Sequence, residues 1–439
     1  MMTHDGSVKK VGSKSRAPRR GSSGGAQLRH ASSDTLLATA AGVVKEATIQ
    51  STIFDTELEE RIPKFDPTEI TLGHVLGRGG FAKVQEIEKI KPFTPTRSLS
   101  RSMTQKTFGE KTFFGFRTIK RGSTVKESDS MSFGEDEKMT RDYVVQRAKH
   151  TQTRKNCCYV VKTVSKESSK LTFMKANVDI ALEGKFLSAL SHRNIIDLVA
   201  VSSSGPCTKN YFLVLERMEE TLAGRLKIWM DRDRMTQGVF GCVGGPMRAE
   251  QLYIERIETS YDIASAMQYL HSHKIVYRDL KPDNIGFDSF NIVKMFDFGL
   301  AKELHDSDKD GEGNYRNMTS MTGAIRYMAP EVGSGDHYNE KCDVYSWSML
   351  MWYMLALEPP FGMYTEDMIM DRSWNRGYRP VIFRRWTRNM KELIKSCWDA
   401  KPTSRMSFLQ ITLALKKELL DFDQSKLSGS VTTSIDNSM

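Results

Sequence analysis

The stretch VYRDLKPDN, residues 276–284, places three chemically active side chains in one short segment. It follows a helical pattern and precedes a short predicted strand, so we expect a loop. The carboxylate of Asp279 can accept the proton of an attacking hydroxyl. The ammonium of Lys281 can neutralise negative charge on a group in transfer, and the amide oxygen of Asn284 can bind a metal ion. The segment therefore indicates catalytic chemistry.

A second acidic motif follows closely in MFDFG, residues 295–299. Asp297 offers another carboxylate ligand for a metal ion, and Gly299 frees the backbone beside it. Two such motifs are not expected this close together by chance. Together they predict a site that handles a metal-bound, negatively charged substrate.

Upstream, LGRGGFAKV (76–84) lies between two strands that we predict over residues 66–89. Glycines let backbone N–H groups close over phosphates, because no Cβ blocks the approach. The phosphate-binding candidates are Leu76, Gly77, Gly79 and Val84. On this motif alone, an ordinary hairpin turn is an equal alternative.

A lysine ends the apolar stretch YVVK (159–162), within a buried strand predicted over 158–164. Desolvating its charge is costly, so Lys162 needs either water or a partner. Glu183 lies on a helix predicted over 177–191 and could pair with it. The alternatives are a strand-end lysine in water and a plain surface glutamate.

In chain order these segments resemble the protein kinase family over about residues 70–420. They are similar to its glycine loop, strand lysine, helix glutamate, catalytic loop and DFG motif, followed by APE at Ala329–Glu331. Asp343 and Arg405 resemble the family's helix aspartate and the arginine that pairs with the APE glutamate. CWDAKPTSR (397–405) and RYMAPEV (326–332) look most like the tyrosine-kinase-like group of serine/threonine kinases.

The resemblance implies an α+β, bilobal protein kinase fold, with a small β-rich N-lobe carrying one main helix and a larger α-helical C-lobe. It implies ATP between the lobes, with Lys162 on its α- and β-phosphates and Mg²⁺ on Asn284 and Asp297. Asp279 would deprotonate the acceptor and Lys281 would stabilise the γ-phosphoryl. Further nucleotide-binding residues implied are Leu76, Gly77, Gly79, Val84, Val160, Glu183, Glu216 and Met218, with Leu215 as gatekeeper.

Composition divides the chain into four parts. Residues 1–65 are basic and Ser/Gly-rich and are predicted to be disordered, apart from a short helix near Thr35–Ile49. Residues 66–218 form the N-lobe, interrupted by a long insertion at about 90–156 in which 136–150 could form an amphipathic helix. Residues 219–420 form the C-lobe, and 421–439 a flexible tail.

The net charge and the cysteine content indicate which kinds of partner and which cellular compartment to expect. The net charge is +10, and most of the surplus lies in the polar insertion, a pattern that favours loose contact with acidic partners over a nucleic-acid groove. The 6 cysteines form no C-x-x-C pair, which indicates reduced thiols and a cytoplasmic or nuclear location. No signal peptide or membrane-spanning run is evident. We expect a monomer.

Four positions depart from the family pattern: Tyr277, Ala82, Gly286 and Ala324. Tyr277 replaces a histidine that packs rather than reacts. Ala82 lacks the third glycine's freedom, and Gly286 lacks the leucine that lies under adenine. Ala324 lacks a hydroxyl that would bond the catalytic residues, although Thr322 could substitute. We therefore predict reduced but real activity.

Arg278 precedes the catalytic aspartate and predicts a phosphate on the activation segment, at Thr319, Ser320 or Thr322. DSDKDG (306–311) in the same segment resembles the start of a calcium loop. Because Asn317 stands where a bidentate glutamate is needed, we favour a solvated acidic loop.

These patterns predict a protein serine/threonine kinase that acts on Ser/Thr acceptors of proteins, with an upstream activating kinase as a further partner. A weakly active or inactive pseudokinase that scaffolds around a nucleotide is the alternative. The intact set Lys162, Asp279, Asn284 and Asp297 favours the enzyme. Transfer to tyrosine is a weaker third hypothesis.

Overall fold

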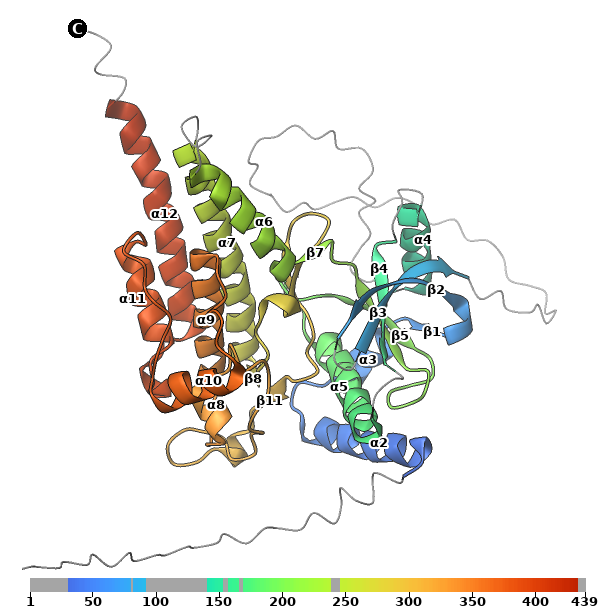
Figure 1. Ribbon diagram of the computed structural model, residues 1–439. Coiled ribbons are helices and arrows are strands. Elements are labelled where there is room, and N and C mark those ends of the chain that lie inside the picture. The colour runs from blue at the N-terminus through green and yellow to red at the C-terminus, as the bar shows by residue number, and fades with distance from the viewer. Residues whose placement is uncertain are drawn as a thin grey trace, which may run out of the picture.

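The computed structural model describes residues 31–79, 82–91, 140–152, 157–165, 169–237 and 245–432. It has two lobes, one built on a sheet and one built from helices, as Figure 1 shows. The predicted α+β bilobal architecture is confirmed. Among the described residues, no helix is both long and apolar enough to cross a membrane.

The first lobe is a 6-stranded sheet in the order β1-β5-β6-β4-β3-β2. Its neighbours run antiparallel, except β1 beside β5. The strands are β1 (Lys64–Phe65), β2 (Ile70–Arg78), β3 (Ala82–Ile90), β4 (Tyr159–Val164), β5 (Leu198–Ser202) and β6 (Phe212–Glu216). The apolar run of β4 is explained by its place inside the sheet, where both faces are covered.

Helix α5 (Lys170–Ala189) packs against one face of this sheet. The side chain of Ser169 accepts a hydrogen bond from the Thr172 N–H and so caps the helix start. The predicted helix over 177–191 is confirmed, but it begins earlier than its apolar spacing suggested. Helix α4 (Arg141–Gln152) lies on the other face, with Val144, Val145 and Ala148 buried. This confirms the helix expected within 136–150.

The N-terminal part of the chain is more ordered than predicted. The short helix expected near Thr35–Ile49 is present as α2 (Ser33–Gln50), and α3 (Thr56–Arg61) follows. Leu36, Leu37, Ala40 and Val44 are buried, and α2 packs along α5. A disordered segment reaching to residue 65 is therefore wrong for residues 33–65, because an apolar stripe lies hidden in a polar composition. Residues 1–30 lie outside the described part.

The second lobe is helical and contains a continuous apolar core. Its helices are α6 (Leu222–Gln237), α7 (Gly245–Ser272), α8 (Pro330–Ser334), α9 (Lys341–Ala356), α10 (Glu366–Ile369), α11 (Arg388–Cys397) and α12 (Phe408–Thr432). Short strands flank the site: β7 (Glu220–Thr221), β8 (Ile275–Val276), β9 (Ile285–Phe287), β10 (Val293–Met295) and β11 (Lys302–Glu303). Single turns are formed by η1 (Pro67–Glu69), η4 (Pro282–Asn284), η5 (Asp306–Asp308) and η7 (Pro402–Ser404), and η6 (Met370–Asn375) is a π-helix.

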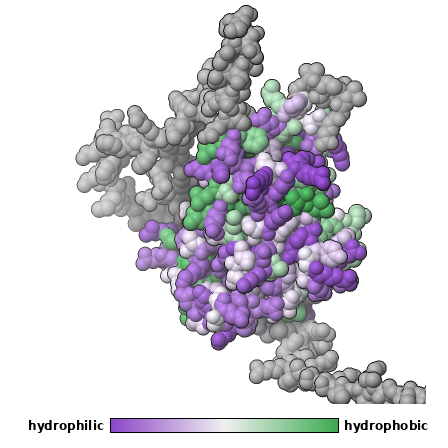
Figure 2. All heavy atoms as spheres, turned by 90° about the vertical axis from the view of Figure 1, so that its left-hand side faces the viewer, coloured by the Kyte–Doolittle hydropathy of each residue, from purple (hydrophilic) through white to green (hydrophobic). Residues whose placement is uncertain are grey.

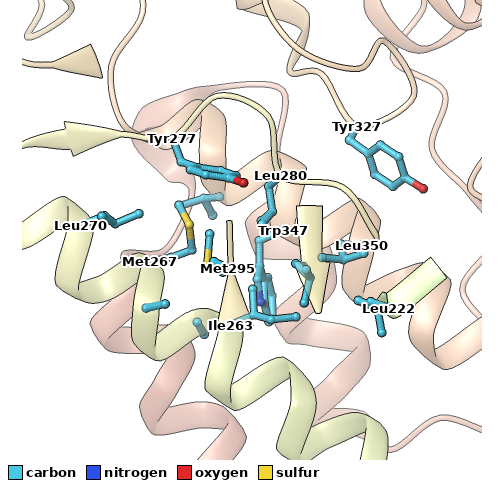
Figure 3. Close-up of a cluster of buried hydrophobic side chains, with 14 of the residues drawn as sticks. Leu222, Ile263, Met267, Leu270, Tyr277, Leu280, Met295, Tyr327, Trp347 and Leu350 are labelled. Atoms are coloured by element: carbon cyan, nitrogen blue, oxygen red, sulfur yellow. The ribbon is translucent and has the colours of Figure 1, made fainter. Parts of the chain in front are cut away.

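Helix α9 is buried on nearly all sides and forms the centre of this lobe, because its sequence is apolar all round. Figure 3 shows Trp347 and Leu350 of α9 in one buried cluster with Ile263 and Met267 of α7. Leu280 reaches this cluster from the loop above it. The core therefore anchors the loop that carries Asp279.

The C-terminal boundary also differs from the prediction. Helix α12 continues past residue 420 to Thr432, and Phe422 stacks on Tyr253 of α7 with ring centroids 5.1 Å apart. This contact explains why the helix does not end where the flexible tail was predicted to begin. Figure 2 views the helical lobe and shows a largely hydrophilic face with separate hydrophobic patches.

Candidate active site

Lys162 lies on β4 with only 8% of its surface exposed. Its Nζ is 2.6 Å from Oε2 of Glu183 on α5, so the two sequence-predicted residues form an ion pair. Burial opposes the charge on this lysine, but Glu183 and then Asp297 outweigh it and raise the pKa of Lys162. The ammonium is therefore held charged in a buried site, where the strand-end alternative would have placed it in water.

Asp297 is the third member of this cluster, with Oδ1 2.9 Å from Nζ of Lys162. Burial opposes ionisation, but the nearby lysine keeps the pKa of Asp297 below its usual value. Lys281 also lowers the pKa of Asp297, which shows that the catalytic loop faces the same site. The backbone of Asp297 has a φ of +68°, an uncommon conformation for a residue with a side chain.

Asp179 was not singled out in the sequence. It lies one turn before Glu183 on α5, and burial, with the charges of Asp297 and Glu183, raises its pKa to about 7. A Cβ added to Gly299 would be 3.0 Å from the Cβ of Asp179, so α5 touches the DFG backbone. The i, i+4 spacing of the two acids is the signal that could have revealed Asp179.

The catalytic loop is fixed from below by Asp343 of α9. Its carboxylate accepts hydrogen bonds from the N–H groups of Tyr277 and Arg278, both at 2.8 Å. His271 Nε2 lies 3.0 Å from the same carboxylate. These bonds hold the backbone of Arg278 at a φ of +69° and orient the next residue, Asp279, toward the site.

Asp279 is buried and its carboxylate is surrounded by donors. Oδ2 accepts from Lys281 Nζ at 2.6 Å and from Asn284 Nδ2 at 2.9 Å. Oδ1 accepts from the backbone N–H of Ala324 at 3.0 Å. The loop residues predicted from one short motif therefore converge on one carboxylate.

Ala324 has no hydroxyl, but its backbone N–H binds the catalytic carboxylate, a contact that the sequence did not predict. Its neighbour Gly323 has a φ of +97°, and a Cβ there would lie 2.2 Å from the carbonyl oxygen of Arg278. Only glycine permits this approach. The proposed substitution by Thr322 is wrong in this structure, because its hydroxyl donates to the Thr319 carbonyl at 3.0 Å instead.

Tyr277 packs, as predicted, instead of entering the site. Its ring lies edge-on to Phe298 with centroids 5.3 Å apart, and its hydroxyl donates to the Phe296 carbonyl. Figure 3 shows the ring above Met267 and Met295 in the buried cluster. Tyr277 therefore joins the DFG segment to the core.

The predicted metal ligands lie at the ends of two paired strands. Asn284 directly precedes β9, Asp297 follows β10, and the Phe296 N–H donates to the Asn284 carbonyl at 3.1 Å. Within the described ranges, no three His, Cys, Asp or Glu side chains gather into a metal site of their own. One carboxylate and one amide fit Mg²⁺ best when phosphate oxygens and water complete its octahedron.

The glycine loop joins β2 and β3, as expected, although residues 80 and 81 lie outside the described part. A Cβ at Gly77 would have no neighbour within 4 Å, so space inside the protein does not explain this glycine. The close approach of a ligand to the backbone, which the resemblance implies, would explain it. Leu76 is exposed beside the loop, Val84 is half-buried and Val160 is buried.

The end of β6 and the residues directly after it were expected to contact adenine through their backbone groups. Glu216 turns its carboxylate to Lys294, 2.8 Å away, which leaves only its backbone for a ligand. Within the described residues, neither the N–H nor the carbonyl of Met218 has a hydrogen-bond partner. Leu215, the predicted gatekeeper, is buried opposite Val160.

Gly286 does not leave a gap. A Cβ there would lie 2.7 Å from Cγ of Met218, so the methionine side chain occupies the space where the family's leucine would project. The sequence suggested a lost contact under adenine. The structure shows one apolar side chain replaced by another from a different segment.

The activation segment is linked to the catalytic loop through Arg278. Nη1 donates to the Thr319 hydroxyl at 2.9 Å, and Nε donates to the Leu300 carbonyl at 2.6 Å. Lys302 lies nearby, and burial together with the charge of Arg278 lowers its pKa. Two cations are thus close to one exposed threonine.

The calcium-loop alternative is not supported. Asp306 pairs with Lys274 at 2.7 Å, Asp308 accepts from Asn317, and Asp310 lies 3.0 Å from His337. These carboxylates point to separate partners.

Farther along the chain, Arg405 binds Glu331 through two hydrogen bonds of 2.6 and 3.0 Å, the pair that the resemblance implied.

Comparison with known proteins agrees with this geometry. The family model for the protein kinase domain matches residues 144–416. The chain is 38% identical over 166 residues to serine/threonine-protein kinase VIK of Arabidopsis thaliana, covering 37% of each chain. It is 32% identical over 231 residues to mitogen-activated protein kinase kinase kinase 12 of Rattus norvegicus, covering 53% of this chain and 23% of that protein. It thus spans little more than a third, or less, of the length of these curated relatives. The chain belongs to the protein kinase family.

Proposed function

We propose that this protein is an ATP-dependent protein serine/threonine kinase that transfers the γ-phosphate of ATP to hydroxyl groups of other proteins. One observation carries the proposal: the cluster of Lys162, Glu183 and Asp297 and the cluster of Asp279, Lys281 and Asn284 face one site between the lobes. The names of the two relatives support the same activity, because both are kinases and one is a serine/threonine-protein kinase.

Each residue has a chemical task in this proposal. Lys162, fixed by Glu183, holds the α- and β-phosphates, and Asn284 with Asp297 holds Mg²⁺. The bound metal ion would supply positive charge that offsets the negative charge of the phosphates. Asp279 orients the acceptor hydroxyl and takes its proton, while Lys281 offsets charge on the phosphoryl group. Leu76, Gly77, Gly79, Val84, Val160, Glu216 and Met218 form the nucleotide contacts.

The pseudokinase alternative predicts nucleotide binding without transfer. Asp279→Asn separates the two. This variant keeps the size of the side chain but removes its basicity, so we expect it to bind Mg-ATP like the wild type and to lose about a hundredfold or more in turnover. Phosphate incorporation into a generic protein measures transfer, and calorimetry measures binding. If neither the wild type nor Asp279→Asn incorporates phosphate, the result would support the pseudokinase.

Further proposals concern regulation and partners. Thr319 is the best of the three candidate phosphorylation sites, because the Arg278 guanidinium already donates to its hydroxyl. An upstream kinase would supply this phosphate. Acceptor proteins would dock as transient partners of a monomer in the cytoplasm or nucleus.

A further inference from the structure

Two helices of the N-terminal segment, α2 and α3, pack against helix α5, which carries Glu183. The first helix of this segment, α2, packs along α5 through Ala40 and Val44, which are buried in the same core as Ile180 and Ala181. The second helix, α3, contacts α5 through Glu59, whose carboxylate lies 2.7 Å from Lys185 Nζ. In Figure 1 both helices lie beside α5. These contacts support the helix that carries Glu183.

The turn between α2 and α3 reaches the other lobe. The Ser51 hydroxyl donates to Oε2 of Glu303 at 2.6 Å, and the Thr52 N–H donates to Oε1 at 3.0 Å. The Thr52 hydroxyl donates to Oε1 as well. Ser51 Oγ also accepts the N–H groups of Ile53 and Phe54, which fixes the turn. We call Ser51, Thr52 and Glu303 the N-terminal latch.

Glu303 is placed where such a latch can affect catalysis. It is 7% exposed and lies on β11, only a few residues after Asp297. β11 pairs with β8, with Glu303 opposite Ile275, and β8 leads directly into the catalytic loop. One carboxylate therefore joins the N-terminal segment to the start of the activation segment.

The ring of Phe54 connects the latch to α5 itself. It meets Phe186 edge-on with centroids 5.0 Å apart, and Phe186 lies one turn after Glu183 on α5. A shift of the turn would therefore be felt at Phe186. Asp179 and Glu183, which share one helix face with Phe186 by their i, i+4, i+7 spacing, touch the DFG segment through Gly299 and Phe298 respectively.

We propose that Ser51, Thr52 and Glu303 are positioning residues for phosphoryl transfer: they hold α5 against the activation segment so that the Lys162–Glu183 ion pair is assembled before nucleotide binds. The inference rests on the proposed function for its catalytic consequence. Hydrogen bonds to an ionised carboxylate are about twice as strong as neutral ones, and three of them meet on Glu303. These bonds fix the turn on β11, and α2, α3 and Phe54 connect that turn to α5.

The test compares Thr52→Val with Thr52→Ser in the full chain. Valine keeps the shape and the backbone N–H but removes the hydroxyl, while serine keeps the hydroxyl. Glu303→Gln is a second probe, because its amide nitrogen would face a donor. We expect Thr52→Val and Glu303→Gln to raise the dissociation constant of a non-hydrolysable Mg-ATP analogue roughly three- to tenfold. Thr52→Ser should resemble the wild type.

Hydrogen exchange separates positioning from general stability. Faster exchange confined to α5 and β11, with α12 unchanged, is expected for Thr52→Val. In turnover assays KM for ATP should rise more than kcat falls, because Lys162 already holds phosphates in the ground state. The proposal is overturned if Thr52→Val and Thr52→Ser bind the analogue equally, or if exchange rises evenly over the whole chain. Binding and exchange need no phosphoryl transfer, so an inactive wild type would sink the proposed function and leave the latch standing.

Discussion

Gly286 and Met218 illustrate how two single residues can depend on one another. Because a Cβ at Gly286 would lie 2.7 Å from Cγ and 3.1 Å from Cβ of Met218, even Gly286→Ala forces the methionine to move. We expect this variant to destabilise the fold by about 1–3 kcal/mol, as overpacking does, and to weaken Mg-ATP binding. Thermal unfolding and calorimetric titration measure the two effects.

The double variant Gly286→Ala/Met218→Ala tests the mechanism. It should recover much of the lost stability, because it removes Cγ and Sδ of Met218, of which Cγ would lie nearest to the new Cβ, at 2.7 Å. Gly42→Ala on α2 is the matched control, since a Cβ there meets nothing within 4 Å. No recovery in the double variant would mean that the backbone of Gly286, rather than its neighbour, decides the outcome.

For single residues, the sequence predicted some members of the site and gave no signal for others. Lys162, Asp279 and Asp297 stand in short motifs whose side chains act together, so their spacing predicts the site. The contact of Met218 with Gly286 joins two segments with no shared pattern. The bond from the Ala324 N–H to Asp279 comes from the backbone, which every residue except proline carries.

Among the elements, regular helices and strands followed from apolar spacing, whereas their ends did not. Helix α5 begins at Lys170, where Ser169 caps it, whereas the predicted helix began only at Asn177. Helix α2 was expected only as a short helix in a disordered tail, since the composition of residues 1–65 averages over its buried face. Which surface receives that face is a tertiary fact that periodicity cannot supply.

The activation segment is the element with the clearest regulatory prediction. Thr319 is held by Arg278 at 2.9 Å, and its carbonyl accepts from the Tyr338 hydroxyl at 2.8 Å. A phosphate on Thr319 would meet two cations, Arg278 and Lys302, whose mutual repulsion it would relieve. We expect Thr319→Val to lower turnover of the activated enzyme about tenfold. Phosphopeptide mass spectrometry measures the modification of Thr319, and steady-state assays measure turnover.

Ser320→Ala is the control for this element, because Ser320 is exposed and adjacent but does not contact Arg278. It should leave turnover and the modification of Thr319 unchanged. Fully active enzyme with Thr319 unmodified would contradict the prediction. So would an activated Thr319→Val variant that matches the wild type.

For the whole molecule, one apolar core extends through both lobes, and a second, smaller core lies between the sheet and α4. Val160 of the sheet lobe and Met295 of the helical lobe belong to the same set of buried residues. The ion pair of Lys162 with Asp297 crosses between the lobes above it. Asp179 lies beside this crossing, so a single ionisation there can change the stability of the whole chain with pH.

The pKa of Asp179 is raised from 3.8 to about 7 by burial and by Asp297 and Glu183, against the smaller opposing effect of Lys162. Since the folded state holds this proton more tightly than the unfolded state, its contribution to stability is complete below pH 4 and is lost as the pH rises through about 7. Asp179→Asn cannot ionise, so it should gain stability over the wild type at pH 8, by up to about 4 kcal/mol, and little near pH 4. Thermal unfolding at both pH values measures the difference, with the exposed Glu46→Gln as control. A gain of equal size at pH 4 and pH 8 would show that packing, rather than the proton, accounts for it.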